Sequence, residues 1–326
     1  MAIKTTQSII CLNLSFMSGI KLFSGTCSHY LAEKIAYEYD QKLGDMTVSK
    51  FSDGEMQPVI NESVRGEYVF FIQSTFAPAD NLLELLLLID AAKRASAGYI
   101  TAVIPYYGYA RQDRKDKPRV PISAKLIANM IEAAGVNRLM TMDFHADQLQ
   151  GFFDIPVDHL KSEPIFSQYI KDNIDLSNVL FASPDVGGVK RARNFARILE
   201  RDFVTCSKYR KKANEIAEMN VIGDVEGMDV ILVDDLIDTA GTLCKAAEVI
   251  MNKGAKSVRA MATHPVLSGK AYENIENSML TEVIVCDTIP LQKQSSKIKV
   301  ISTAKLFARA IRNTHENRSI EALFDM

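Results

Sequence analysis

The stretch DVILVDDLIDTAGT, residues 229–242, joins a strand pattern to a helix start, and this junction decides the fold class. Residues 229–235 are mainly branched apolar side chains that end in two adjacent carboxylates, which is typical of a buried strand. Residues 239–242 form a small-residue turn that opens the next helix. A buried strand that passes into a helix through so short a turn indicates an α/β protein.

The same alternation of strands and helices continues on both sides of this junction. In the first half of the chain the patterns predict strands at 68–74, 99–107 and 138–145, and helices at about 79–97 and 122–134. In the second half they predict strands at 178–185, 203–208, 229–235, 257–265 and 282–288, with helices after Gly187, Thr242 and Gly269. We therefore expect two α/β domains in tandem, each a mainly parallel sheet flanked by helices. Ligands of such folds bind beyond the carboxyl ends of the strands.

The composition is typical of a soluble chain with two domains. Its 326 residues are long enough for two cores, and a net charge of −2 argues against a nucleic-acid-binding surface. The longest apolar stretch, residues 81–92, is interrupted by Glu84 and Asp90 and is too short to span a membrane. Residues 1–16 are interpreted as a dispensable extension, because polar residues interrupt their apolar segment. The cysteines include no C-x-x-C pair, so we expect a reducing, cytoplasmic compartment.

The junction at 229–242 also predicts a ligand with two different ends. Backbone N–H groups and the hydroxyls of Thr239 and Thr242 can bind a phosphate at the helix start. The carboxylates of Asp234 and Asp235 can accept hydrogen bonds from vicinal sugar hydroxyls or hold water on a divalent ion. Ribose 5-phosphate satisfies both ends. The alternative is an acidic loop followed by an N-capped helix, with no ligand.

Several longer motifs carry a resemblance to a known family. The junction resembles the PRPP loop of type I phosphoribosyltransferases, which indicates the sugar phosphate but not the reaction. Across residues 17–326 the chain resembles ribose-phosphate pyrophosphokinases through five further motifs. These are FSDGE (51–55), YYGYARQDRKDKPR (106–119), MDFHADQLQGFFDIPVDHL (142–160), SPDVGGVKRAR (183–193) and SKYRKKANE (207–215).

This resemblance implies a fold, a reaction and an assembly. The fold is two tandem type I phosphoribosyltransferase-like domains, at 17–160 and 161–307, with residues 308–326 joining the first domain. The reaction is the Mg²⁺-dependent transfer of the β,γ-diphosphoryl group of ATP to the C1 hydroxyl of ribose 5-phosphate. The assembly is a homo-oligomer, a hexamer built from dimers.

The segment 106–119 is the candidate ATP clamp. Its arginines match phosphate oxygens well, and an aromatic residue can stack on adenine, although a solvated basic loop is the alternative. By the resemblance, residues 51–55 reach the ATP of a facing subunit, and the other contacts come from the same chain. The implied ATP-binding residues are Phe51, Asp53, Glu55, Arg111, Gln112, Asp116, Arg119 and His145.

The resemblance also assigns the metal, catalytic and sugar-phosphate residues. His145 and Asp185 match the family's metal ligands, although a lone histidine at a strand end is often structural, as we expect for His159, His264 and His315. Lys208 and Arg210 match the catalytic pair, in an arm that would close over the transferring group. The implied ribose 5-phosphate residues are Asp234, Asp235, Asp238, Thr239, Ala240, Gly241 and Thr242. Gly187 and Gly188, followed by Lys190 and Arg191, form a second helix start that suits a pyrophosphate contact.

Regulation is the part where the chain departs from its resemblance. The common class of these enzymes is activated by phosphate and inhibited by ADP, and the matching positions are Arg65, Asp147, Gln150, Ser319 and Phe324. Some relatives have a small hydroxyl residue where this chain has Asp147, whose carboxylate should repel phosphate at close range. We therefore expect a weakened phosphate requirement, or an effector pocket rearranged around Asp147.

Three other functions remain open at this stage. A phosphoribosyltransferase would share the loop at 234–242, but it has no use for an ATP clamp. A catalytically silent relative of the synthetase would be expected to have a disrupted arm or loop, whereas both are intact here. A PRPP-sensing transcription regulator would need a DNA-binding module, and no basic patch or helix-turn-helix extension is apparent.

Overall fold

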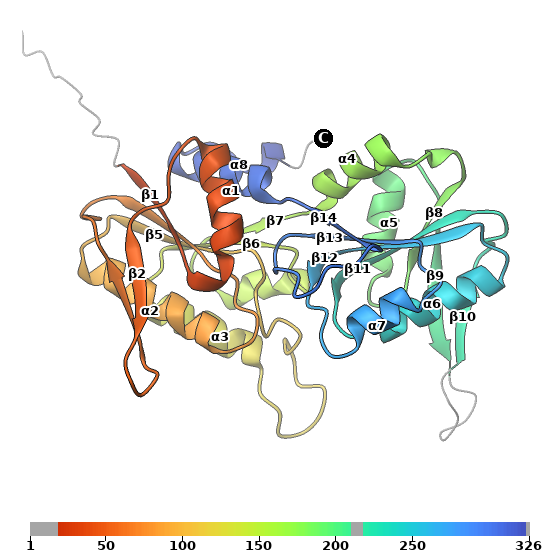
Figure 1. Cartoon of the computed structure of the whole chain (residues 1–326), viewed down its shortest axis with the longest axis horizontal. Coiled ribbons are helices and arrows are strands. Elements are labelled where there is room, and N and C mark those ends of the chain that lie inside the picture. The colour runs from red at the N-terminus through yellow and green to blue at the C-terminus, as the bar shows by residue number, and fades with distance from the viewer. Residues whose placement is uncertain (1–18, 210–217, 324–326) are drawn as a thin grey trace, which may run out of the picture.

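The computed structural model describes residues 19–209 and 218–323 of the chain. They form two α/β units placed side by side, with the N-terminal unit on the left and the C-terminal unit on the right of Figure 1. Within the described residues, no helix has the length and apolar character required to cross a membrane.

The N-terminal unit is built on a five-stranded sheet in which every strand pair is parallel. Its strand order is β1 (Ile20–Ser24), β4 (Tyr68–Ile72), β5 (Tyr99–Ile104), β6 (Arg138–Met142) and β7 (Val157–Leu160). The connecting helices are α1 (His29–Tyr39), α2 (Asp80–Arg94) and α3 (Ser123–Ala134). A separate antiparallel hairpin, β2 (Met46–Lys50) and β3 (Met56–Ile60), projects from this unit (Figure 1).

The C-terminal unit contains a seven-stranded sheet that is parallel except at one edge, where β10 runs antiparallel to β9. Its strand order is β10 (Glu218–Ile222), β9 (Phe203–Tyr209), β8 (Val179–Ser183), β11 (Asp229–Ile237), β12 (Ser257–Pro265), β13 (Glu282–Cys286) and β14 (Ile298–Ile301). Its helices are α4 (Glu163–Asn173), α5 (Val189–Ile198), α6 (Gly241–Asn252) and α7 (Ala271–Glu276). The last helix of the chain, α8 (Ala304–His315), packs on α1 of the N-terminal unit.

Successive residues of the central strands face opposite sides of each sheet, and helices cover both sides. In β4, Phe71 packs in the cluster under α2 and α3, whereas Phe70 packs in the cluster under α1 and α8. In β11, Leu232 faces α6 and α7, whereas Ile231 faces α4 and α5. Because both faces are buried, these strands have continuous apolar sequences rather than the alternating pattern of a half-exposed sheet.

The predicted α/β class is confirmed, and most of the predicted strands shorten at their carboxyl ends. The run at 99–107 forms a strand only to Ile104, and the run at 138–145 ends at Met142. The second difference has a local cause, because Asp143 adopts a left-handed backbone with a φ of 37° that ends the strand. The pattern did not predict β1, the β2–β3 hairpin, β7, β10, β14 or the helices α1, α4 and α8.

Candidate active site

The loop between β11 and α6 forms one half of the candidate site. β11 places Asp234 and Asp235 near its carboxyl end, and α6 begins at Gly241. The preceding residue, Ala240, has a left-handed backbone (φ 61°), so that the chain turns sharply into the helix. The N–H groups of the first helical turn are thus presented beside two carboxylates, which is an arrangement for a phosphate next to a diol.

Helix α7 and the loop before it hold this turn in place. Asn274 Nδ2 donates a hydrogen bond to the Thr239 carbonyl at 2.8 Å, and Ser268 Oγ donates to the Asp238 carboxylate. The pKa of Asp238 is therefore lowered, first by the Ser268 hydrogen bond and then by a neighbouring arginine. The loop between β11 and α6 is thus held by side chains from two other segments of the C-terminal unit.

The two adjacent carboxylates of β11 have opposite electrostatic surroundings. Burial and the neighbouring charge of Asp235 raise the pKa of Asp234. Burial also opposes the ionisation of Asp235, but the hydrogen bond from His145 and the charge of Arg191 together lower its pKa. One carboxylate of the pair is compensated by protein groups, and the other is the one that gains most from a nearby cation.

A histidine of the N-terminal unit meets this acidic pair directly. His145 Nδ1 lies 2.7 Å from Asp235 Oδ2, although the two residues are 90 positions apart in the sequence. The hydrogen bond with Asp235 raises the pKa of His145. His145 therefore belongs to the boundary between the two units, where it can act on groups bound to either of them.

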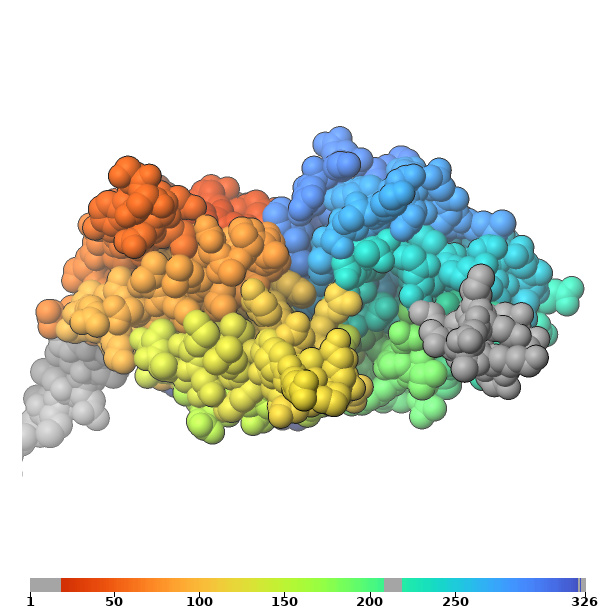
Figure 2. All heavy atoms as spheres, turned by 90° about the horizontal axis from the view of Figure 1, so that it is seen from below, coloured from red at the N-terminus to blue at the C-terminus, as the bar shows by residue number. Residues whose placement is uncertain are grey.

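A second ion pair crosses the same boundary. Arg111 belongs to the loop after β5, and its Nη1 lies 2.6 Å from Oδ2 of Asp238, in the loop between β11 and α6. The loop after β5 forms a pocket of about 440 Å³ that is lined by three cationic residues and by His145. The three cations are Arg111, Arg114 and Lys117. Figure 2 shows this projecting yellow segment beside the green and cyan residues of the C-terminal unit.

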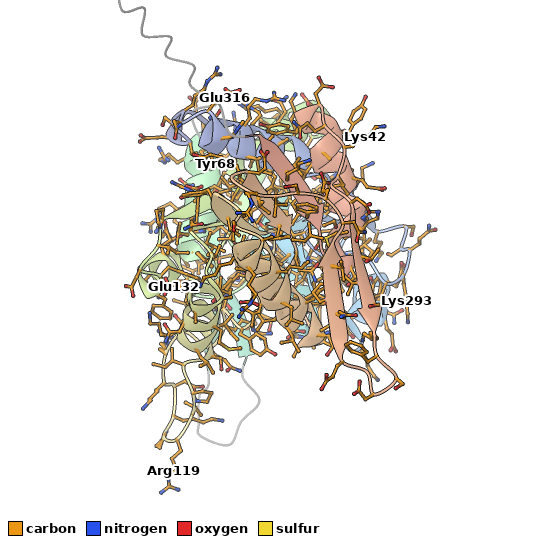
Figure 3. All side chains as sticks on the ribbon, turned by 90° about the vertical axis from the view of Figure 1, so that its left-hand side faces the viewer. Lys42, Tyr68, Arg119, Glu132, Lys293 and Glu316 are labelled. Carbon is orange, nitrogen blue, oxygen red and sulfur yellow. The ribbon has the colours of Figure 1, made fainter. Side chains whose placement is uncertain are left out.

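The other predicted ATP-clamp residues are all exposed in this loop. Gln112 lines the pocket, where its side-chain oxygen accepts a hydrogen bond from Ser123, and Asp116 also lines it. Arg119 has a left-handed backbone (φ 63°) and is exposed. Figure 3 shows Arg119 at the outer end of the projecting loop.

The hairpin residues predicted to contact ATP are not gathered with the others within this chain. Phe51, Asp53 and Glu55 are all exposed at the tip between β2 and β3, and Phe51 has 52% of its surface accessible. They are not among the described residues that line the pocket of the clamp. Figure 1 shows the hairpin tip apart from the loop that follows β5.

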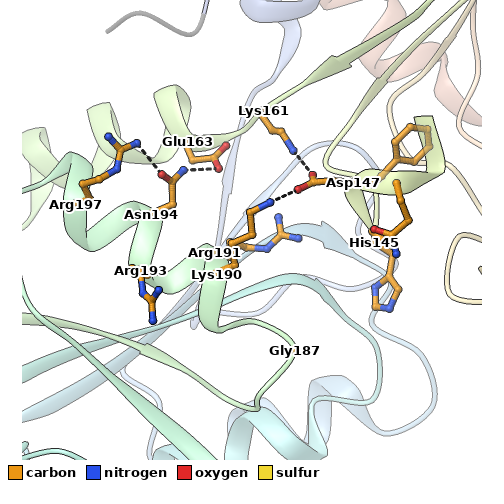
Figure 4. A pocket seen from close by; sticks show the side chains of 13 residues that line it. His145, Asp147, Lys161, Glu163, Gly187, Lys190, Arg191, Arg193, Asn194 and Arg197 are labelled. Carbon is orange, nitrogen blue, oxygen red and sulfur yellow. Dashed lines mark hydrogen bonds and ion pairs between the residues drawn. The ribbon is translucent and has the colours of Figure 1, made fainter. Parts of the chain in front are cut away.

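A larger pocket, of about 600 Å³, lies between α5 and the short 3₁₀ helix Asp147–Phe152. Its cationic lining residues are Lys161, Lys190, Arg191, Arg193 and Arg197. Asp147 lies among them, with Lys161 Nζ at 2.7 Å from one carboxylate oxygen and Lys190 Nζ at 2.6 Å from the other (Figure 4). Burial opposes ionisation of Asp147, but the two lysines lower its pKa well below the usual range. Asp147 is thus a fully compensated anion, with partners that the sequence reading did not include.

The other predicted effector residues are dispersed. Gln150 is near Asp147, since its Nε2 donates to the Asp147 carbonyl at 3.0 Å. Arg65 forms an isolated β-bridge with Ala97, and neither Arg65 nor Ser319 is among the described residues lining the 600 Å³ pocket. Phe324 lies outside the described residues.

The two predicted metal ligands occupy loops after β6 and β8. Asp185 accepts a hydrogen bond from the Gly188 N–H at 3.1 Å, and its charge contributes to the raised pKa of Asp234. Among the described residues, no group of three or more His, Cys, Asp or Glu side chains is arranged to hold a metal ion by itself. Mg²⁺ usually takes one or two protein carboxylates and completes its shell with water and substrate phosphates, so Asp185 and Asp234 have the right donor chemistry.

Of the predicted catalytic pair, Lys208 and Arg210, only Lys208 belongs to the described residues. Lys208 lies in β9, where its backbone pairs with Met219 of β10. Arg210 follows that strand and lies outside the described residues.

Three residues of this region, Asp143, Lys161 and His264, were not predicted from the sequence as ligand contacts, whereas Arg191 was predicted at a helix start that suits a pyrophosphate. Lys161 compensates Asp147, while Arg191 faces the buried Asp143, with its Nη1 at 3.8 Å from Asp143 Oδ1. His264 was expected to be structural, and it contacts the Asp143 carbonyl at 3.1 Å. Polar residues at the carboxyl ends of strands were the available signal, but the apolar run predicts one strand over 138–145, whereas the strand ends at Met142 and the chain turns at Asp143.

Comparison with protein families covers most of the chain. Residues 20–135 match the family model described as the N-terminal domain of ribose phosphate pyrophosphokinase. Residues 176–325 match the model described as the phosphoribosyl synthetase-associated domain.

Individual relatives agree with these models. A ribose-phosphate pyrophosphokinase of Wolinella succinogenes is 56% identical over 309 residues, which cover 94% of this chain and 100% of that protein. A protein of the same name from Porphyromonas gingivalis is 54% identical and covers 94% of this chain and 98% of its own. The crystal structure of phosphoribosylpyrophosphate synthetase from Mycobacterium smegmatis has a TM-score of 0.87 and 39% identity, covering 92% of this chain and 100% of that one.

Proposed function

The chain belongs to the ribose-phosphate pyrophosphokinase family, and from this premise we propose that it transfers the β,γ-diphosphoryl group of ATP to the C1 hydroxyl of ribose 5-phosphate. The products are PRPP and AMP. The compartment that we propose is the cytoplasm.

The proposed reaction is a direct in-line displacement. The C1 hydroxyl oxygen attacks the β-phosphorus of ATP, and the bond from that phosphorus to the oxygen bridging the α- and β-phosphates breaks. AMP leaves with the bridging oxygen, and the hydroxyl proton is lost to water. No thiol or imidazole lies in residues 234–242 to act as a covalent nucleophile, so positioning and charge neutralisation carry the catalysis.

The observation that carries this proposal is the pair of contacts across the boundary between the two units. Arg111 of the ATP clamp meets Asp238 of the sugar-phosphate loop at 2.6 Å, and His145 meets Asp235 at 2.7 Å. The groups assigned to ATP are therefore in contact with the groups assigned to ribose 5-phosphate. A transfer between two substrates needs this adjacency, whereas two independent binding sites would not.

Different residues of the chain are proposed to bind the two substrates and to stabilise the transition state. Arg111, with Arg114 and Lys117 in the same pocket, would bind and orient the triphosphate. The N-terminus of α6 would bind the 5-phosphate, while Asp234 and Asp238 would accept hydrogen bonds from the ribose. Lys208 and Arg210 would stabilise the charge that develops on the transferring phosphorus.

We propose that Asp185 and His145 hold the Mg²⁺ of the ATP complex, with Asp234 close to its shell. When bound, the ion neutralises phosphate charge and polarises the phosphoryl oxygens. Imidazole is a poor ligand for Mg²⁺, so His145, whose Nδ1 contacts Asp235, would act partly through a bound water.

The function is tested by following AMP. We expect the purified full chain to release AMP from ATP only when ribose 5-phosphate and Mg²⁺ are present, with one PRPP formed for each AMP. A phosphoribosyltransferase would instead consume PRPP and release pyrophosphate with a nucleobase present. A silent relative of the synthetase would release neither product, and either result would contradict the proposal.

We further propose that the protein is a homo-oligomer in which the β2–β3 hairpin reaches the ATP site of a facing subunit. The exposure of Phe51, Asp53 and Glu55 at the hairpin tip supports this, because within one chain they are not among the described residues that line the pocket of the loop after β5. The expected assembly is a hexamer built from dimers, and light scattering of the purified protein measures it directly. A stable, fully active monomer would contradict it.

The response to phosphate is a separate prediction, which concerns Asp147. Asp147→Ser removes the carboxylate that Lys161 and Lys190 now share, so both lysines become available to an external anion. We expect the concentration of phosphate needed for half-maximal activity to fall about tenfold, as expected for charge-assisted hydrogen bonds. The measurement is initial rate against phosphate concentration at constant ionic strength.

A matched control for this titration is Asp172→Ser. Asp172 is an exposed aspartate at the end of α4, and its carboxylate is bonded to Gln168 rather than to a lysine. The control is expected to titrate like the parent protein. A steep phosphate dependence that is the same in the parent, Asp147→Ser and Asp172→Ser would show that the lysine pair takes no part in the response.

A further inference from the structure

The turn after β6 is held in an unusual backbone conformation. Asp143 has a φ of 37° although it is not glycine, and only 1% of its surface is exposed. Buried non-glycine residues keep such a conformation only where the surrounding contacts determine it, and such positions gather at functional sites. The residues that follow, Phe144 and His145, leave the sheet at this turn.

The carboxylate of Asp143, a residue of the N-terminal unit, is held by groups of the C-terminal unit. Its Oδ2 accepts hydrogen bonds from the Ser162 hydroxyl, from the Ser162 N–H at 3.3 Å and from Thr263 Oγ1 at 2.5 Å. Ser162 directly precedes α4, and Thr263 belongs to β12 of the C-terminal sheet. Its Oδ1 has no hydrogen bond among the described residues and faces Arg191 Nη1 at 3.8 Å.

The backbone of Asp143 is held by the same strand of the C-terminal sheet. His264 Nε2 lies 3.1 Å from the Asp143 carbonyl, and because a carbonyl only accepts, Nε2 carries the proton. The other ring nitrogen lies 2.9 Å from Thr288 Oγ1, so both sides of the buried imidazole are engaged. His264 and Thr263 thus bind the main chain and the side chain of one aspartate.

β12, which binds Asp143, is adjacent to β11, which contacts His145. In the register of β11 and β12, Leu236 pairs with His264 and Asp234 pairs with Ala262, which places Asp235 between these two pairs. Asp235 is the residue that His145 contacts at 2.7 Å. The adjacent strands β11 and β12 therefore hold both Asp143, where the turn begins, and His145, where it ends.

Phe144, which lies between Asp143 and His145, is held by residues of the N-terminal unit. The Phe144 N–H donates to His159 Nε2 at 2.9 Å, and the Phe144 ring packs against Tyr107 at 5.3 Å between ring centroids. With Asp143 bound to the C-terminal unit and Phe144 bound to the N-terminal unit, the main chain has little freedom before His145. The direction of the imidazole follows from these contacts rather than from His145 itself.

We propose that Asp143 is a positioning residue for the diphosphoryl transfer, which acts by fixing His145 on Asp235 across the boundary between the two units. Thr263 binds the carboxylate of Asp143 and His264 binds its carbonyl, and these contacts hold the left-handed backbone that directs the chain toward His145. The inference rests on the proposed assignment of His145 to the ATP half of the site.

The test is a double-mutant cycle in the full chain, with Asp143→Asn, His145→Ala and the combined variant. Asparagine keeps the size of the side chain and tolerates a left-handed backbone, so the change removes mainly the charged hydrogen bonds. We expect Asp143→Asn to lower kcat by about 10²-fold, as for a displaced catalytic group. KM for ATP and for ribose 5-phosphate should change by less than about threefold. The combined variant should be no more than about threefold slower than His145→Ala, because both changes remove one function.

The control for a merely structural effect is Asp158→Asn. Asp158 is a largely buried carboxylate of the N-terminal sheet, paired with Arg138 at 2.6 Å. This variant is expected to lower the melting temperature while kcat stays close to that of the parent. If Asp143→Asn fails to fold, Thr263→Val removes a single donor to the carboxylate with little change of shape. It should lower kcat about tenfold, with the same lack of additivity towards His145→Ala.

Three results would overturn the inference. The first is a kcat of Asp143→Asn, or of Thr263→Val if the former does not fold, within about threefold of the parent. The second is a combined variant whose loss equals the product of the single losses, which would mean that Asp143 does not act through His145. The third is an unchanged kcat in His145→Ala, which would remove the proposed role of His145 as well. The first two results concern only whether Asp143 acts through His145, so the proposed function survives them.

Discussion

Replacing either Lys208 or Arg210 with alanine is expected to lower kcat by about 10³-fold, because each would supply positive charge to the phosphorus only as the transition state forms. Affinity for ATP and ribose 5-phosphate should change little, since other residues are assigned to hold both substrates. The measurement is a steady-state analysis of both variants, together with substrate binding by calorimetry.

The control for this experiment is Lys245→Ala. Lys245 is an exposed lysine on α6 that pairs with Glu248 at 2.8 Å, so its loss removes the same charge from the C-terminal unit. Its kcat should match that of the parent. If Lys208→Ala or Arg210→Ala also turns over at a near-normal rate, that residue has no catalytic role.

Arg111→Ala is expected to raise KM for ATP by about 10²-fold, since a charge-assisted contact with phosphate contributes about 1.5–3 kcal/mol. Asp238→Asn should instead raise KM for ribose 5-phosphate, even though the side chains of Arg111 and Asp238 are in contact at 2.6 Å. The reason is that each member of this ion pair is proposed to bind a different substrate. Arg111 would bind the triphosphate of ATP, and Asp238 would bind the ribose. The measurement is KM for each substrate at saturation of the other.

Arg94→Ala provides a matched comparison for Arg111→Ala. Arg94 forms an exposed ion pair with Asp90 on α2, and its N–O distance is also 2.6 Å. Since exposed pairs of this kind contribute little, both KM values should stay at the parent level. If Arg111→Ala behaves like Arg94→Ala, or if Asp238→Asn raises KM for ATP alone, the proposed division between the two substrates is wrong.

Local patterns were sufficient for the inner strands of the two sheets, whereas the edge strands β1, β7, β10 and β14 were not predicted. Apolar runs such as 229–235 and 257–265 have sequence features that do not depend on distant residues, and both became strands of the C-terminal sheet. The hairpin at β2 and β3 was missed because its side chains are exposed or only half-buried, which leaves no apolar run to detect. The ends of strands were also predicted poorly, because a single residue such as Asp143 can end a strand by its φ angle.

The prediction for Asp147 shows the limit of reading one position at a time. A carboxylate considered alone repels phosphate, so the sequence predicts a weakened phosphate requirement or a pocket rearranged around Asp147, without naming the partners of Asp147. In the folded chain Asp147 is compensated by Lys161 and Lys190, which are 14 and 43 residues away. No local pattern links these three side chains, because their contact depends on how α5 packs beside the N-terminal unit.

By itself the sequence determined the α/β class and the family, since these depend on periodicity and on motifs that lie within short segments, and the residues assigned to each substrate stay a prediction. Only the tertiary structure decided which of those residues meet. Arg111 contacts Asp238 over 127 positions, and His145 contacts Asp235 over 90. These contacts arise where the carboxyl ends of strands from two separate sheets face each other. The placement of one sheet against the other follows from the packing of the whole chain and is not encoded in any one motif.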